Sequence, residues 1–545
     1  REQLADRSTS ELTRAGHAAR TRYEQRRRDR SSAFSRRRRL GRGIPRGRTT
    51  RWGVDAMNLR DIASALTTGK TTPTEHVRSV LAELDALAGT PWENAVAARN
   101  DEAALEAAAL ADEQIAAGNW IGPLHGVAVA VKDNIDVAGF PTRCGSAVLA
   151  DASPARRDAR VIEKLREAGA IVVAKTHLHE FAYGPTGLIN ASGAASHPHN
   201  PDLISGGSSS GSAVLVARGV VPVALGTDTG CSVRTPAALC GIVGFKPGFG
   251  ALPEQGVFPL STTFDHVGLL AADAWTPRSR GAPCRASRTC APRSPNCASD
   301  ACGVASGICR PSSTRPSRRR AAPSRIWRRV VDVELPETDE MLELYPVVTG
   351  SEAYETHRSW FEADPDRYQP PTAALLAAQR DRPAYEYIHA ARAVARLRHD
   401  VVHRLRTVDK LDALITVTTG VRSAPLTSDP VELRAPLLQM CIPFSVLGVP
   451  AVSVPAPDGG SSPVGLQIVG LTGGTHGHGS HPAESAAFAV AMAVEASGQP
   501  RCGRRVLGTR GRSRPRRRSP TTKNAATARG CRRTHCCRRP WPPRC

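Results

Sequence analysis

The stretch that decides how this chain is interpreted, residues 206–247, reads GGSSSGSAVLVARGVVPVALGTDTGCSVRTPAALCGIVGFKP. Two glycine-rich loops that carry serine, GGSSSGS (206–212) and GTDTGCS (226–232), flank an apolar segment. Upstream, a lone lysine, Lys132, lies at the end of the apolar run GVAVAVKDN. Two serines and a buried lysine can supply a nucleophile, a proton bridge and a base, which is the chemistry of acyl transfer without a histidine.

The sequence around this stretch alternates between two periodicities. Apolar runs at 127–131, 171–174 and 221–225 predict buried strands, and residues 158–168 show a helical pattern that Gly169 ends. Strands that alternate with helices indicate an α/β layered fold. Runs that are apolar throughout indicate a sheet covered on both faces.

Further elements are expected on both sides of this region. Leu59, Ile62 and Leu66 share a helical face, and Thr72-Pro73-Thr74-Glu75 predicts a capping box at the start of a second helix. The remaining predicted elements are an Ala-rich helix at 101–117, helices between 340 and 408, a strand at 411–419, and strand-like runs at 443–455 and 463–470.

The net charge of +23 is distributed unevenly. Residues 1–53, 276–329 and 500–545 are aperiodic and carry +12, +12 and +16, so the remaining sequence carries −17. We interpret these Arg-, Pro- and Cys-rich segments as GC-rich DNA read out of frame; the alternative is a genuine basic tail and insertion that bind nucleic acid. The expected division is a basic segment (1–56), the two parts of one domain (57–275 and 330–498), the aperiodic segment between them (276–329) and a basic tail (499–545).

Cysteine usage follows the same division. Ten of the 14 cysteines lie in the last two basic segments. The remaining four, Cys144, Cys231, Cys240 and Cys441, are widely spaced, which is typical of a reduced cytoplasmic enzyme rather than a disulfide framework. Apolar runs of 18 residues and the apolar core of a secretory signal are both missing, so we expect a cytoplasmic protein without a membrane partner.

Five pieces in order give the chain a specific likeness to a known family. They are 123–139 (PLHGVAVAVKDNIDVAG), 206–213 (GGSSSGSA), 226–247, 265–268 (DHVG) and 463–470 (PVGLQIVG), and the sequence that contains them resembles the amidase signature family over 57–274 and 330–497. The resemblance implies a single amidase domain: a three-layer α/β/α sandwich around a large, mixed, twisted sheet. It also implies that neither a metal nor a cofactor is needed.

The resemblance assigns chemical roles to three residues. Ser232 is the nucleophile, Ser208 the bridging serine and Lys132 the base, and the peptide bond Gly207–Ser208 is expected to be cis. Physical reasoning agrees, because a serine is a poor nucleophile until a base takes its proton, and lysine is a base only when burial lowers its pKa. The resemblance also assigns a set of oxyanion donors, which are the N–H groups of Thr229, Gly230, Cys231 and Ser232, with Asp228 and Arg234 paired to support the loop.

Neighbouring residues in these motifs have more ordinary interpretations. The family pattern has two glycines before the nucleophile where this chain has Gly230-Cys231, so a side chain at 231 is expected to crowd the loop if its φ is positive. Ser209 and Ser210 are expected to form loop hydrogen bonds. A metal site at His177, His179 or the histidines of 475–481 is not favoured.

Four functions are compatible with the sequence. The preferred one is an amidase that hydrolyses a carboxylic amide to a carboxylate and ammonia or an amine through a Ser232 acyl-enzyme. The others are the glutaminase-type A subunit of a tRNA-dependent amidotransferase, a protein that binds nucleic acid through its basic tails, and an inactive or mistranslated amidase relative. The expected partner is a small-molecule amide rather than nucleic acid, and a homodimer is left open.

Overall fold

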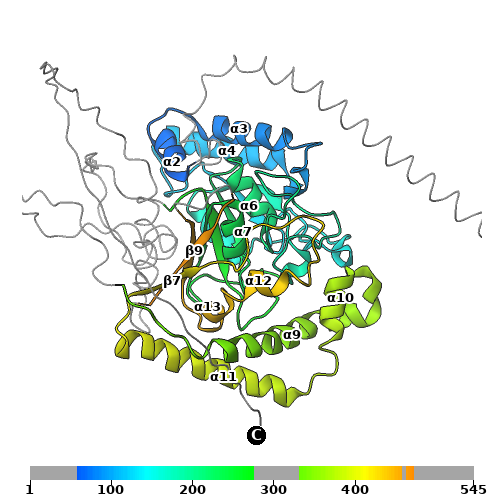
Figure 1. Ribbon diagram of the computed structural model, residues 1–545. Coiled ribbons are helices and arrows are strands. Elements are labelled where there is room, and N and C mark those ends of the chain that lie inside the picture. The colour runs from blue at the N-terminus through cyan, green and yellow to red at the C-terminus, as the bar shows by residue number, and fades with distance from the viewer. Residues whose placement is uncertain (1–57, 275–329, 457–461, 472–545) are drawn as a thin grey trace, which may run out of the picture. The chain divides into compact units, whose positions relative to one another are not determined.

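The computed structural model of the chain describes residues 58–274, 330–456 and 462–471 (Figure 1). All of these residues belong to one compact unit within Arg1–Gln499. The predicted segments 1–56, 276–329 and 499–545 lie outside the described residues. The account that follows therefore concerns the two parts of the predicted domain.

A mixed sheet runs through the described part of the chain. It has nine strands in the order β1-β3-β2-β4-β6-β5-β8-β9-β7, and β2 pairs in parallel with β3 and β4, whereas the other pairs are antiparallel. The strands are β1 Val96–Arg99, β2 Ala128–Lys132, β3 Ile171–Thr176, β4 Val223–Thr227, β5 Val243–Lys246, β6 Val267–Ala271, β7 Ala413–Val417, β8 Ala451–Pro455 and β9 Gly465–Gly470. The predicted α/β fold with a large mixed sheet is confirmed.

The helices of the described ranges lie before and between these strands. They are α2 Leu59–Thr67, α3 Pro73–Asp85, α4 Asp101–Ala116, α5 Arg160–Glu167, α6 Ser210–Ala217, α7 Arg234–Cys240, α9 Thr338–Ala363, α10 Pro370–Ala377, α11 Ala384–His403, α12 Arg434–Leu438 and α13 Ile442–Val446. The predicted capping box is present, since Thr72 Oγ1 accepts from Glu75 N and Glu75 accepts from Thr72 N. The sequence therefore predicted the start of α3 correctly.

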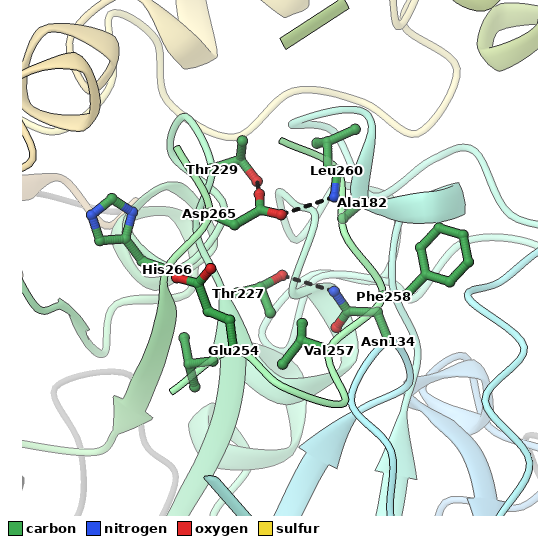
Figure 2. A pocket seen from close by; sticks show the side chains of 11 residues that line it. Asn134, Ala182, Thr227, Thr229, Glu254, Val257, Phe258, Leu260, Asp265 and His266 are labelled. Carbon is green, nitrogen blue, oxygen red and sulfur yellow. Dashed lines mark hydrogen bonds between the residues drawn. The ribbon is translucent and has the colours of Figure 1, made fainter. Parts of the chain in front are cut away.

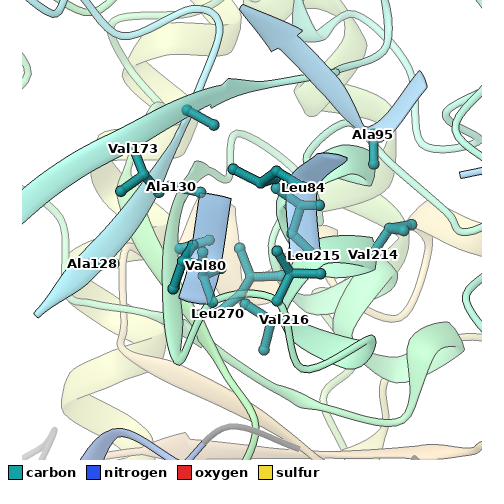
Figure 3. Close-up of a cluster of buried hydrophobic side chains, with 14 of the residues drawn as sticks. Val80, Leu84, Ala95, Ala128, Ala130, Val173, Val214, Leu215, Val216 and Leu270 are labelled. Atoms are coloured by element: carbon teal, nitrogen blue, oxygen red, sulfur yellow. The ribbon is translucent and has the colours of Figure 1, made fainter. Parts of the chain in front are cut away.

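Helices cover both faces of the sheet, and every side chain of β2 is therefore buried. Ala128 and Ala130 pack with α3, α4 and α6 on one face, where the small alanines allow close approach (Figure 3). Val129 and Val131 point to the other face and pack with α2 and α5. This arrangement makes three layers and places the end of β2 in the interior of the domain.

One predicted strand is partly wrong. The run 443–455 was expected to be strand-like, but its first residues form α13 and only Ala451–Pro455 form a strand, β8. Pro443 lies in the first turn of α13, where a proline has no intrahelical N–H bond to lose. Over so short a run, a buried helix and a buried strand have the same apolar pattern, so the sequence does not distinguish them.

A helix that crosses a bilayer needs about 20 predominantly apolar residues. None of the helices in the described ranges is both long enough and apolar enough to do so.

Candidate active site

Lys132 is the last residue of β2, and its side chain is fully buried. Its Nζ lies 2.6 Å from Ser208 Oγ and 2.7 Å from Thr227 Oγ1. Burial lowers the pKa of Lys132 to about 7, against the opposing pull of the Asp228 and Asp265 carboxylates. The lowered pKa makes the free amine of Lys132 accessible near neutral pH.

Asp133, the neighbour of Lys132 in sequence, does not neutralise it. The Asp133 carboxylate forms a buried ion pair with Lys175, at 2.9 Å from the Lys175 ammonium. Within the described ranges, Lys132 has two hydroxyl partners, a long contact of 3.5 Å to the Thr227 carbonyl oxygen, and no ion-pair partner. A buried lysine without a carboxylate beside it favours the neutral amine, which can accept a proton.

Ser208 lies in the loop that leads into α6, and the peptide bond Gly207–Ser208 is cis. The loop is packed tightly, because a Cβ on Gly207 would lie 2.6 Å from the backbone nitrogen of Gly187. The next residue links this loop to the second serine loop, since Ser209 N donates to Ser232 O at 3.1 Å. The two serine loops are therefore adjacent, and Lys132 contacts the first of them.

Ser232 lies two residues before the start of α7 and is buried. Within the described part of the chain, the backbone N–H groups from Thr229 to Ser232 have no protein acceptor, whereas those of Val233 and Arg234 donate to Asp228 Oδ2. Buried N–H groups are rarely left unsatisfied in proteins. Four consecutive free donors make this loop suited to binding a negatively charged oxygen.

Arg234 fixes the shape of this loop. Its fully buried guanidinium forms two hydrogen bonds with the Asp228 carboxylate, at 2.9 and 2.8 Å, and a third with Gly230 O at 2.8 Å. The other donors reach three partners far along the sequence, namely Cys441 O, Ser445 Oγ and Gln467 Oε1. The ion pair lowers the pKa of Asp228 to about 2, because the carboxylate is stabilised by the arginine despite its burial.

Cys231 does not strain the loop. Its φ is not among the positive values that the described residues show, so the side chain is accommodated without the conformation that favours glycine. The thiol is buried in the cluster that contains Phe264, Tyr345 and Cys441. Burial raises the pKa of Cys231, which keeps the thiol protonated and a poor nucleophile.

A small pocket borders the oxyanion-type loop (Figure 2). In it, Asp265 accepts hydrogen bonds from Thr229 Oγ1 at 2.6 Å and from Leu260 N at 2.9 Å. Burial raises the pKa of Asp265 to about 6, and burial together with the charge of Asp265 raises the pKa of Glu254 to about 7. Asp265 thus holds Thr229, the first residue of the row of free N–H donors, through a side-chain hydrogen bond that does not involve Arg234.

The other polar residues singled out in the sequence lie in the supporting structure. Ser209 Oγ donates to Thr227 O at 3.2 Å, and the Ser210 hydroxyl and His177 Nδ1 are 2.9 Å apart. His179 is buried, and its Nδ1 lies 3.3 Å from Thr186 Oγ1. The histidines of 475–481 lie outside the described residues.

Three residues near the site were not predicted from the sequence. Thr227 Oγ1 accepts hydrogen bonds from Lys132 Nζ and from Asn134 Nδ2, and Figure 2 shows the second of these. Tyr345 and Leu438 lie against the loop, since a Cβ on Gly230 would be 2.5 Å from Tyr345 Oη and 3.0 Å from Leu438 Cδ2. Thr227 lies in the motif 226–232, just after the apolar run 221–225, and that position was a usable signal. Tyr345 and Leu438 have no local motif.

The fold is similar to that of solved amidases, and the comparisons with known proteins identify the family. The model of the family described as Amidase matches residues 75–276. The chain is 32% identical over 455 residues to the A subunit of glutamyl-tRNA(Gln) amidotransferase from Chloroflexus aurantiacus, covering 75% of this chain and 91% of the relative. It is 31% identical over 472 residues to fatty acid amide hydrolase of Medicago truncatula, covering 80% and 76%. The chain belongs to the amidase family.

A solved structure agrees with the sequence matches. The peptide amidase of Stenotrophomonas maltophilia has a TM-score of 0.63 to this chain at 26% identity, covering 84% of this chain and 98% of the amidase. Two other amidotransferase A subunits match only 39% of this chain, over 44% and 43% of their own length. The activity of this particular chain is therefore inferred from its own site.

Proposed function

We propose that this protein is an amidase that hydrolyses a small carboxylic amide to a carboxylate and ammonia or an amine through an acyl-enzyme at Ser232. One observation carries the proposal: the buried Lys132 amine, with a pKa lowered to about 7, lies 2.6 Å from Ser208 Oγ. The adjacent loop of free N–H groups supports the same chemistry. The proposed partner is the amide itself, and because one chain supplies all of these groups, a homodimer is compatible with the site.

In the first half-reaction, Ser232 Oγ attacks the amide carbonyl carbon. Its proton moves to Ser208 Oγ while the Ser208 proton moves to the neutral Lys132 amine, which becomes an ammonium. The carbonyl oxygen becomes an oxyanion that the N–H groups from Thr229 to Ser232 stabilise. When the C–N bond breaks, the proton returns through Ser208 to the leaving nitrogen, and an ester to Ser232 remains.

Water completes the cycle by the same route. It attacks the ester carbonyl, and its proton passes through Ser208 to Lys132. Collapse of the second tetrahedral intermediate releases the carboxylic acid as Ser232 regains its proton. The enzyme returns to its starting protonation state, so Lys132 acts as base and then as acid in each half-reaction.

The experiment is labelling and turnover with Ser232→Ala. A fluorophosphonate probe should label the unmodified protein at Ser232, and the variant should neither be labelled nor release ammonia from a panel of primary amides. Ser192→Ala, which changes an exposed serine far from the loop in sequence, is the matched control and should retain both properties. Unreduced turnover by Ser232→Ala would overturn the mechanism.

The relatives among amidotransferase A subunits favour a second candidate, a glutaminase that acts within a tRNA-dependent amidotransferase. The observation behind it is the match that covers 91% of the Chloroflexus aurantiacus protein. Isolated protein that hydrolyses simple amides but not glutamine would support the stand-alone amidase. Hydrolysis restricted to glutamine, and raised by the other amidotransferase components, would support the second candidate.

We also propose a cytoplasmic location. Cys144, Cys231, Cys240 and Cys441 are all free thiols in the structure. Cys231 lies in the loop that holds Ser232, and the backbone carbonyl of Cys441 contacts Arg234, which supports that loop. Free thiols in a large enzyme are typical of a reducing compartment. Fractionation of cells that express the full chain tests this, and recovery with periplasmic or secreted markers would contradict it.

A further inference from the structure

Arg434 is a charged side chain near the proposed site that the mechanism does not use. It is the first residue of α12, and it is half-buried. Its Nη1 donates to Tyr183 O at 3.0 Å, and its guanidinium carbon lies 5.4 Å from the centroid of the Tyr183 ring. None of the carboxylates within the described ranges forms an ion pair with it, whereas the nearby Arg382 is paired with Glu386 at 2.8 Å.

Tyr183 connects Arg434 to the loop that carries Ser208. The residues that follow Tyr183 pack directly on that loop, since Gly207 N donates to Pro185 O at 2.7 Å. Tyr183 is itself buried, so the guanidinium is held against an ordered part of the site rather than extended into solvent. The arginine is therefore positioned by the same segment that positions the proposed bridging serine.

A second connection runs through α12 to the Ser232 loop. Leu438 lies four residues after Arg434, and side chains four apart share one face of a helix. Leu438 Cδ2 would be 3.0 Å from a Cβ on Gly230, and Tyr345 Oη would be 2.5 Å from it. The positive charge of Arg434 also reaches Tyr345: burial raises the pKa of the Tyr345 hydroxyl, and the charge of Arg434 partly offsets that increase.

These contacts leave most of the guanidinium donors available beside the site. Arginine carries five N–H donors in a planar fork that matches a carboxylate, and a charged hydrogen bond is stronger than a neutral one. The neighbouring side chains Leu438, Tyr183 and Tyr345 are apolar or aromatic, so they offer no competing anion. An anionic group on the substrate could therefore serve as the ion-pair partner of the Arg434 guanidinium.

We propose that Arg434 is a specificity residue that selects amides carrying a carboxylate, which it binds through its unpaired guanidinium. This inference rests on the proposed function, because it names the substrate class of the same site. Arg434 touches no reacting atom and positions the substrate rather than taking part in proton transfer. Its removal should therefore change which amide is preferred, and should leave the hydrolysis of neutral amides nearly unchanged.

The test compares matched anionic and neutral substrates. Succinyl 4-nitroanilide carries the carboxylate on the acyl part, and 4-methylpentanoyl 4-nitroanilide replaces it with an isopropyl group. N-butyrylglycine and N-butyrylisobutylamine form the corresponding pair for the amine part. We expect kcat/KM to favour the anionic member of at least one pair by on the order of 10- to 100-fold, mostly through KM.

The variants assign that preference to one side chain. Arg434→Gln should abolish it, Arg434→Lys should restore part of it, and Arg382→Gln, which removes a cation that is already paired, should leave it intact. A preference that survives in Arg434→Gln, or equal rates within both pairs for the unmodified protein, overturns the inference while leaving the amidase proposal standing.

A binding measurement separates this inference from the proposed function. Succinate is titrated by calorimetry into Ser232→Ala and into the double variant with Arg434→Gln. Succinate should bind the first more tightly by the same order of 10- to 100-fold. If no amide is hydrolysed by the unmodified protein, the proposed function fails, and this comparison still decides whether Arg434 binds a carboxylate.

Discussion

Lys132 owes its chemical character to what surrounds it at the end of β2. Burial disfavours the ammonium, and the nearest acidic side chain in sequence, Asp133, is already paired with Lys175. The hydroxyls of Ser208 and Thr227 can hydrogen-bond to either protonation state of the amine. The environment of Lys132 thus brings its pKa close to neutral pH, whereas the sequence around it predicts only that the side chain is buried.

The pH dependence of hydrolysis should follow the Lys132 amine. The folded protein holds this pKa at about 7, below the ordinary value of 10.5, so the free base is lost as pH falls through 7. We expect kcat/KM on a neutral amide to rise with pH to a plateau above about 8, with an acid limb near 7. Lys132→Ala should lose several orders of magnitude, and Lys70→Ala, an exposed lysine, should keep the profile.

The carboxylate of Asp265, whose pKa is raised to about 6, offers a competing explanation for such a limb. Asp265→Asn distinguishes the two, because it keeps a polar partner for Thr229 and removes the titration. A limb that remains near 7 in Asp265→Asn assigns it to Lys132. A limb that disappears assigns it to Asp265, and a flat profile from pH 6 to 9 in the unmodified protein contradicts the role of Lys132.

At the scale of elements, the loop between β4 and α7 depends on a single ion pair. Arg234 pairs with Asp228 and also donates to Cys441, which directly precedes α13, to Ser445 within α13, and to Gln467 on β9. A buried charge whose partner is removed is strongly unfavourable. The loop, α7, α13 and β9 therefore form one structural unit around this guanidinium.

Arg234→Met should destabilise the protein by about 3–5 kcal/mol, because the Asp228 carboxylate would remain buried without its partner. Urea unfolding followed by circular dichroism measures the change. Arg396→Gln is the matched control, since its ion pair with Glu340 is exposed and should contribute within about 1 kcal/mol. Equal losses for the two variants would contradict the central role of the buried pair.

The elements also show what the sequence could and could not predict. Continuous apolar runs identified β2, β3 and β4, because a sheet covered on both faces needs no polar alternation. The same pattern failed at α13, where a short apolar run fits either a helix or a strand. Motifs identified the two serine loops, but Tyr345 and Arg434 are brought to them only by tertiary packing, which leaves no local signal.

For the whole molecule, we propose that residues 57–275 and 330–498 form the working domain and that the basic segments contribute no core. Segments 1–53 and 500–545 lack a periodic apolar face, so they can bury little apolar surface. Deleting both should leave kcat/KM and the thermal midpoint nearly unchanged. A deletion that also removes α2 is the control and should destabilise the protein, because Ile62 and Leu66 pack against β2.

A loss of activity of tenfold or more after the first deletion would contradict this division. So would nucleic-acid binding that both tails confer and that salt abolishes, since it would give the basic segments a function of their own.

The long sequence separation between Arg234 and its partners also determines when the site can form during synthesis of the chain. Gln467 lies 233 residues after Arg234, so a ribosome that has just made the Ser232 loop still has to synthesise β9 before the guanidinium has all of its partners. At the usual rate of about 5–20 residues per second, that interval lasts on the order of tens of seconds. The nascent chain therefore carries both serines and Lys132 well before it can complete the loop. Chains released early should therefore lack the amide hydrolysis proposed for the complete domain.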